Sequence, residues 1–398
     1  MNFRSRLRPA LAVTLVAAAT LGLAGTAGAA LKANPSNPLA KPGAWNYSAI
    51  DSSRSNPELT NYRRESDPHR KAALAKIALT PKARWFANCT ACNPSLVRDQ
   101  VKTYVADARR RDPNALVQLA IFGLWPDGEV VNGKRPAMSW SLARYQGWIK
   151  QVAAGIGSAR VAIILEPDLA ISANHGNDGR ELRDPSASRR MAMTAWSAAY
   201  LSRTLTRESI YIDAGSADWL YLDEAVRLLR ASGIRSVRGF ALGATHYDSV
   251  ASNVSYANAL SARLAKLGIT GKKAVIDTAD NGTPFTWKQW NARWGAKYNQ
   301  THDEYYLFDN TPTCGSRTEK VCQTLGHRPT WNPIDSEAAK VGLGTNHATL
   351  RRQAARVVDG FLWFGRGWRW MQQGGGDPNT KTRSIRMGTY TRFIQAHG

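Results

Sequence analysis

The chain has 398 residues and a formal net charge of +23 at pH 7, because 53 lysines and arginines outnumber 30 aspartates and glutamates. The basic residues are scattered, without a basic tail, a zinc-finger pattern or an RNP motif, so the charge favours attraction to an anionic surface such as a cell wall over nucleic-acid binding. No GxSxG, HExxH or P-loop motif is present, and no GxGxxG follows the first strand, which argues against serine hydrolases, zinc proteases, NTPases and dinucleotide-binding enzymes.

The first thirty residues have the features of a secretory signal peptide. A basic head is followed by an apolar stretch from Leu11 to about Leu23 and by the small residues TAGAA. We expect cleavage near Ala30 and a secreted, extracellular protein. No later apolar run approaches the roughly twenty residues that a membrane-spanning helix needs, so no membrane span is expected.

Residues 31–60 are rich in Pro, Asn and Ser and predict an extended leader rather than a separate module. Residues 61–398 are then expected to form one domain. From residue 94 the pattern alternates between amphipathic helices and short apolar strands. The predicted helices cover about 95–111, 139–156, 189–204, 221–232 and 252–267. The predicted strands cover 115–122, 160–168, 209–215, 237–244, 273–280 and 359–367.

Apolar strands that alternate with helices predict a parallel sheet covered by helices, and six or more of them favour a β/α barrel over an open sheet. Function gathers at the carboxyl ends of barrel strands. Here those ends read FGLWPDGE, EPD, DAG, ALGATHYD and DTADNG, so most carry carboxylates. We expect these carboxylates to converge on one cleft.

Paired Asp and Glu residues can cleave a glycosidic bond, one as a proton donor and the other by activating water or attacking carbon. They could also hold a hard metal, but they lie on separate strands with no DxDxDG loop, so we expect neither metal nor cofactor. Aromatic faces stack on sugar rings, and the candidate residues at strand ends or in loops are Trp85, Trp125, Trp219 and Trp331.

Four cysteines lie at 89, 92, 314 and 322, and no histidines stand beside them at ligand spacing, which in a secreted chain favours disulfides over zinc. Three pairings are possible. We favour Cys314–Cys322, with Cys89–Cys92 or a cross pairing as the remaining alternatives.

Several segments together resemble glycoside hydrolase family 6, the inverting cellulases, over about residues 80 to 370. The resemblance implies an α/β fold: a single domain that forms a distorted (β/α) barrel of about seven parallel strands. It also implies that a β-1,4-glucan binds across the C-terminal face of this barrel. The segments, in the family's order and with roughly its spacing, are IILEPDLAIS, YIDAGSADW, GFALGATHYDS, AVIDTADNG, RPTWNP and VDGFLW.

The resemblance also implies roles for single residues. Asp168 of EPD matches the general acid, and Asp213 of DAG matches a neighbouring carboxylate that helps to keep the acid protonated. Like charges close together raise one pKa, which gives the acid a reason to hold its proton. Trp85, Trp219 and Trp331 match positions where the family stacks aromatic rings on glucosyl units.

The chain departs from the family pattern at two places. Phe122 stands where the family has a tyrosine, and the carboxylate that should follow is either Asp127 or, with one inserted residue, Glu129, which we favour. Near the C-terminus Gly365 stands at a lysine position and Arg369 near an acidic one. The usual base is therefore missing, and its identity stays open.

We expect a secreted, monomeric inverting glycosidase that cleaves β-1,4-glucosidic bonds of cellulose-like glucans. The alternative is a non-catalytic relative that binds cell-wall or matrix glycans, and a third class is a charge-driven binder of nucleic acid or teichoic acid. Arg366 and Arg369 raise the further hypothesis that the sugar is anionic. The insertion from about residue 286 to 328 is expected to build one wall of the cleft.

Overall fold

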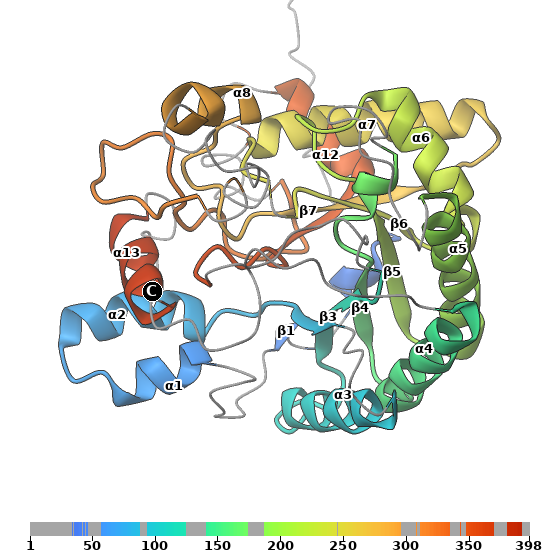
Figure 1. The fold of residues 1–398 in the computed structure, drawn as a ribbon, viewed down its shortest axis with the longest axis horizontal. Coiled ribbons are helices and arrows are strands. Elements are labelled where there is room, and N and C mark those ends of the chain that lie inside the picture. Colours follow the sequence, from blue (N-terminus) through green and yellow to red (C-terminus); the bar gives the residue numbers. More distant parts are fainter. Residues whose placement is uncertain are drawn as a thin grey trace, which may run out of the picture. The chain divides into compact units, whose positions relative to one another are not determined.

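One sheet of parallel strands organises the unit formed by residues 32–398 (Figure 1). The computed structural model describes residues 34, 36–41, 43, 45–46, 57–87, 94–124, 141–173, 187–244, 246–295, 308, 311–334, 343, 348–369 and 380–391. The strands are β1 (Trp45–Asn46), β2 (Arg84–Ala87), β3 (Leu116–Phe122), β4 (Val161–Leu165), β5 (Glu208–Asp213), β6 (Gly239–Leu242), β7 (Lys273–Asp277) and β8 (Val358–Leu362).

Helices connect most of these strands and cover the sheet (Figure 1). The described helices are α1 (Pro57–Arg64), α2 (Pro68–Ala78), α3 (Pro94–Ala108), α4 (Leu142–Ile156), α5 (Ala187–Thr204), α6 (Leu222–Ala231), α7 (Val250–Lys266), α8 (Trp287–Trp290), α12 (Ala348–Val357) and α13 (Thr380–Tyr390). The helices and strands predicted from residue 94 onward all appear, with ends that differ by a few residues. The structure also places β1 and the start of α1 within the predicted leader 31–60.

The sheet is seven strands wide, and all its pairs are parallel. The order is β1, β3, β4, β5, β6, β7, β8, and β2 joins the same edge of β3 as β1. β1 pairs with the start of β3 at Leu116, whereas β2 pairs with its end through Ala87 and Phe122. The predicted distorted β/α barrel of about seven strands is therefore confirmed.

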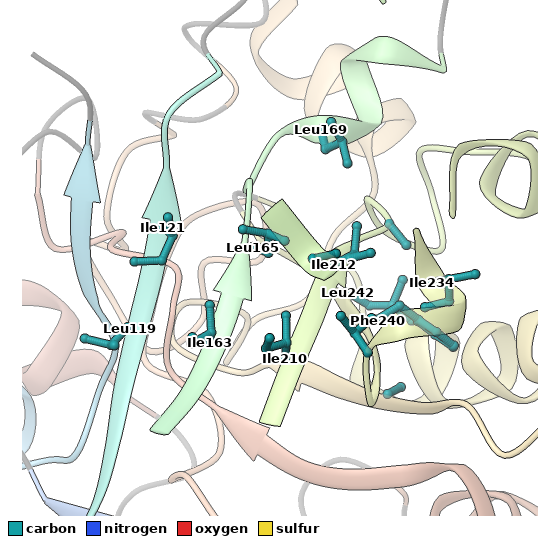
Figure 2. Close-up of a cluster of buried hydrophobic side chains, with 14 of the residues drawn as sticks. Leu119, Ile121, Ile163, Leu165, Leu169, Ile210, Ile212, Ile234, Phe240 and Leu242 are labelled. Atoms are coloured by element: carbon teal, nitrogen blue, oxygen red, sulfur yellow. The ribbon is translucent and has the colours of Figure 1, made fainter. Parts of the chain in front are cut away.

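Alternation along the strands divides the core into two layers, because successive side chains point to opposite faces of a sheet. One set packs against the surrounding helices, and Figure 2 shows Leu119, Ile163, Ile210 and Phe240 of this set on neighbouring strands. The other set fills the barrel interior with smaller residues: Leu116, Ala120, Ala162, Ile164, Tyr211, Ala241, Val275 and Leu362. Runs that are apolar on both faces are typical of buried parallel strands.

The barrel is held between β2 and β8 by single hydrogen bonds, since no ladder joins these two strands in the described part of the chain. The backbone N–H of Ala83 donates to the carbonyl of Trp363 at 2.7 Å, and the indole N–H of Trp85 donates to the carbonyl of Phe364 at 2.6 Å. The sheet is thus curled but incompletely closed, and loop residues after β8 lie beside β2.

A buried ion pair ties β8 to strands across the barrel interior. Asp359 is fully buried and accepts two hydrogen bonds from the Arg238 guanidinium, at 2.7 and 2.8 Å. The hydroxyl of Tyr211 on β5 donates to the same carboxylate at 2.8 Å. Bidentate pairs of this kind fix geometry as well as charge.

The segment after β7 carries the disulfide Cys314–Cys322, as predicted. It also contributes to a cluster of buried aromatic rings, in which Trp290 and Phe308 pack against Tyr247 and Phe285. The other predicted cysteines, Cys89 and Cys92, lie outside the described residues. Among the described helices, none has the length and apolar character that crossing a bilayer requires.

The Arg238–Asp359 pair supports a stability prediction. Arg238→Leu leaves the Asp359 carboxylate buried with its charge uncompensated, so we expect the free energy of unfolding in urea to fall by about 3–5 kcal/mol. The double variant Arg238→Leu/Asp359→Leu should lose less than the single one, because it leaves no orphaned charge.

The control is Arg263→Leu, which breaks the exposed pair with Asp223 on the protein surface. We expect a loss within about 1 kcal/mol for that variant. Equal losses for Arg238→Leu and Arg263→Leu would show that the buried pair has no special weight.

Candidate functional site

Ionisable side chains gather at the carboxyl ends of the strands, where β/α barrels place their sites. The segment after β4 supplies Glu166 and Asp168, β5 ends in Asp213, and the segment after β8 supplies Arg366. The other groups at this edge are Asp218, His246, Asp248, Asp277 and Asp280.

The two carboxylates of the EPD segment have different surroundings. Glu166 is fully buried and accepts hydrogen bonds from the backbone N–H of Gly123 at 2.9 Å, of Leu124 at 2.8 Å, and from the Tyr145 hydroxyl at 2.7 Å. Burial outweighs these bonds and raises the pKa of Glu166 to about 7. Glu166 therefore joins the ends of β3 and β4 and does not face a substrate.

Asp168 lies two residues further on, in a strained turn. Glu166 has φ +54° and Asp168 has φ +65°, and they are the two non-glycine residues with positive φ in the described part of the chain. Left-handed backbone costs a non-glycine residue roughly 1–2 kcal/mol, and such strain concentrates at functional sites. The turn leaves Asp168 8% exposed, whereas Glu166 is sealed.

Asp213 on β5 is tied to the turn that follows Asp168. Its Oδ2 accepts hydrogen bonds from the backbone N–H of Ala170 and of Gly215, both at 3.3 Å, while its Oδ1 has no partner. Burial, and next the charge of Asp168, raise the pKa of Asp213 to about 8. The structure thus brings the predicted pair Asp168 and Asp213 together, with Asp213 protonated near neutral pH.

Trp85 and Phe122 lie at the same edge, on β2 and β3. Their rings meet edge to face with centroids 5.2 Å apart. The guanidinium of Arg366 lies 4.0 Å from the centroid of the Trp85 ring. One face of Trp85 is therefore covered by a cation, and its role as a sugar platform stays a prediction.

Trp219 also has a covered face. The imidazole of His246 stacks on it with centroids 4.6 Å apart and an interplanar angle of 14°. The Nδ1 of His246 pairs with Oδ1 of Asp218 at 2.9 Å. Burial lowers the pKa of His246, but the charges of Asp218, Asp248 and Asp168 raise it above the ordinary value. Sequence reasoning missed His246, although its motif, ALGATHYD, had been noted as a strand end.

A second carboxyl pair lies where β7 meets the segment after β8. A Cβ at Gly365 would lie 2.5 Å from Oδ2 of Asp277 and 3.0 Å from Oδ2 of Asp280, so only glycine fits beside them. Burial raises the pKa of Asp277 to about 7; burial and the charge of Asp277 raise that of Asp280 well above its usual range. Gly365 therefore makes room for these two carboxyls.

The remaining predicted residues differ in how far the structure describes them. Trp331 is 42% exposed, and its carbonyl accepts a hydrogen bond from the Asn37 side chain at 3.1 Å. Arg369 is bound to Glu58 at 2.5 and 2.9 Å. The predicted residues Trp125, Asp127 and Glu129 lie outside the described residues.

No cluster of three or more His, Cys, Asp or Glu residues with the geometry of a metal site occurs in the described part of the chain. The groups that are present suit proton transfer. Asp168 is buried except for 8% of its surface, Asp213 beside it holds a proton at neutral pH, and His246 can exchange one near the same edge.

The buried carboxyls predict that stability falls as pH rises. The pKa values of Glu166, Asp248 and Asp277 are raised to about 7, and that of Asp213 to about 8. The folded chain therefore keeps protons that the unfolded chain releases above about pH 4. The pKa of His246 is also raised in the folded chain, so its contribution to stability is likewise lost as the pH rises through that pKa. We expect the urea midpoint at pH 5 to exceed that at pH 8.

Asp213→Asn is the matched variant, because asparagine mimics the neutral carboxyl. We expect a smaller drop in the urea midpoint between pH 5 and pH 8 than in the parent chain. Glu58, with a pKa lowered to about 2, loses its stabilising charge only below about pH 4 and so does not affect this window. A midpoint that rises from pH 5 to pH 8 would contradict the assignment of buried, protonated carboxyls.

Curated proteins with related sequences are named as endoglucanases. Endoglucanase A of Thermobispora bispora is 29% identical over 289 residues, which cover 72% of this chain and 58% of that protein. Endoglucanase A of Cellulomonas fimi is 33% identical over 213 residues, which cover 53% of this chain and 42% of that protein. The matched stretches thus span less than two thirds of these relatives.

Solved structures share the fold. The endoglucanase Cel6 from Mycobacterium tuberculosis, in complex with a thio-linked cellobioside, has a TM-score of 0.60 and 23% identity, covering 88% of this chain and 98% of that one. Cellobiohydrolase II (Cel6A) from Humicola insolens, in complex with glucose and cellotetraose, has a TM-score of 0.56 and 19% identity, covering 82% and 85%.

The family model of glycosyl hydrolases family 6 matches residues 44–301, which is more than half of the chain. The match includes the EPD and DAG segments that carry Asp168 and Asp213. Together with the curled parallel barrel and its carboxyl pair, the match shows that this chain belongs to glycosyl hydrolases family 6.

Proposed function

We propose that the protein hydrolyses β-1,4-glucosidic bonds of a cellulose-like glucan with inversion at the anomeric carbon. The observation that carries this proposal is the pair formed by Asp168, which is buried except for 8% of its surface, and the fully buried Asp213, whose pKa is raised to about 8. Family membership and the endoglucanase names of the relatives support the substrate class.

In this proposal Asp168 is the general acid that protonates the leaving glycosidic oxygen. Asp213 acts on Asp168 rather than on the sugar, since it is fully buried and bound to the backbone at Ala170 and Gly215. An inverting enzyme also needs a water molecule activated on the opposite side of the sugar ring. The residue that activates this water stays open, and the proton can leave through a chain of waters, while Glu129 or Asp127 acts beside Asp168 and helps to tune it.

Secretion is a further part of the proposal. Residues 1–30 have the pattern of a signal peptide, and the disulfide Cys314–Cys322 suits an oxidising compartment. Removal of the three arginines of residues 1–30 leaves a formal charge of 23 − 3 = +20, which would hold such a protein near anionic cell-wall polymers, and we expect it to act there as a monomer.

The second candidate function is glycan binding without turnover. It is favoured by the segment after β8, where Gly365, Arg366 and Arg369 stand and where residues 360–369 contain no carboxylate. In that case Asp168 and Asp213 would only position hydroxyl groups of the bound sugar.

Asp168→Asn separates the two functions. If Asp168 is the general acid, the release of reducing ends from β-glucans should fall by about 10²–10⁴-fold, because this variant has no proton to donate. The urea midpoint and the binding of cello-oligosaccharides should stay close to those of the parent chain.

Asp223→Asn is the control, since it removes a carboxylate on α6 that is exposed and pairs with Arg263. It should keep full activity. Full activity in folded Asp168→Asn would refute the assignment of the acid, and a silent parent chain that still binds oligosaccharides would establish the second function.

A further inference from the structure

Arg366 differs from the other arginine in the same segment. Arg369 is fully engaged by the Glu58 carboxylate. The Arg366 side chain forms no hydrogen bond and no ion pair with any described residue, and its Nε is buried without a partner. A guanidinium has five N–H donors; the Nε–H of Arg366 is unpaired away from water, which is costly, whereas the side chain as a whole is only partly buried.

The contact with Trp85 positions this cation without using its donors. The guanidinium lies 4.0 Å from the indole centroid, and such a contact is an electrostatic attraction to the ring face. The indole is itself held in place, because its N–H donates to the Phe364 carbonyl at 2.6 Å and its ring meets Phe122 edge to face. Arg366 is therefore held in position with its hydrogen-bonding edge unused.

The carboxylates around Arg366 do not neutralise it. Burial lowers the pKa of Arg366, while the charges of Glu58 and Asp168 raise it. Glu58 already binds Arg369, however, and no ion pair joins Asp168 to Arg366. Arg369 adds repulsion. The planar fork of an arginine matches a carboxylate through two parallel hydrogen bonds, which a neutral hydroxyl cannot reproduce.

We propose that Arg366 binds a carboxylate carried by the glucan, on the sugar that meets Trp85, and so makes the protein selective for acidic β-glucans. This inference rests on the proposed function, which supplies the β-glucan, and it adds that the glucan carries carboxylates. Arg366, held against the Trp85 ring, would receive the anionic substituent of the sugar at the edge that contains Asp168.

Binding, rather than turnover, tests the proposal, so it does not depend on catalysis. The probes are a thio-linked cello-oligosaccharide, which resists hydrolysis, and the same compound oxidised to carboxylates at C6. We expect calorimetry to show about 10- to 100-fold tighter binding of the acidic probe by the parent chain, the range of one charge-assisted bidentate contact. The preference should shrink as NaCl is added.

Three variants locate the preference. Arg366→Gln should abolish it while keeping affinity for the neutral probe, and Arg366→Lys should retain part of it through charge alone. Arg263→Gln removes the same charge from the exposed surface of α7 and should keep the full preference. Urea midpoints of all three establish that they fold.

Equal affinity of the parent chain for both probes would overturn the proposal, as would a preference that survives in Arg366→Gln. Failure of the proposed function is separate, since it appears as absent turnover in the parent chain. A parent chain that binds the acidic probe preferentially but releases no reducing ends would support this site and refute the hydrolase.

Discussion

The hydrogen bonds that the Glu166 carboxylate accepts from the backbone of Gly123 and Leu124 join the carboxyl ends of β3 and β4, and the site depends on them. Because Glu166 is turned inward, the backbone adopts left-handed conformations at Glu166 and again at Asp168. The second of these leaves Asp168 8% exposed, beside the buried Asp213. The buried carboxyl group of Glu166 thus sets the position of Asp168, which is 8% exposed.

Burial of acidic groups recurs along the whole edge. Asp213, Asp248, Asp277 and Glu166 all have pKa values raised to about 7 or 8, since the low-dielectric interior disfavours their charged forms. The edge therefore carries less negative charge at neutral pH than its composition suggests. A cation such as Arg366 is consequently less neutralised by its neighbours than a count of carboxylates would indicate.

Arginines that pair with carboxylates stabilise this barrel, whereas Arg366 is suited to binding a ligand. Arg238 with Asp359, and Arg369 with Glu58, form bidentate pairs that connect distant parts of the chain. Breaking either would leave a buried charge, so their role is structural. Arg366 has no such partner among the described residues, and its contact with Trp85 uses none of its N–H donors. The same residue type therefore holds the fold at two positions and offers recognition at a third.

The sequence by itself determined the alternation of strands and helices from residue 94 onward, because apolar periodicity depends only on local order. It also determined that Asp168 and Asp213 end adjacent strands, since the carboxyl ends of parallel strands meet at one edge. Periodicity gave no sign of β1 and β2, which are short and pair with the two ends of β3. It likewise gave no sign that the Glu of EPD turns inward while the Asp does not.

Only the tertiary structure decided which side chains meet across the edge. His246 stacks on Trp219 from another strand, Arg366 covers Trp85 although 281 positions separate them in the chain, and Gly365 makes room for Asp277 and Asp280. The contact of Arg366 with Trp85 depends on the curl of the sheet, which brings the end of β8 beside β2, whereas the other two contacts join the ends of paired strands. Their physical cause is long-range packing, and no local pattern of residues encodes it.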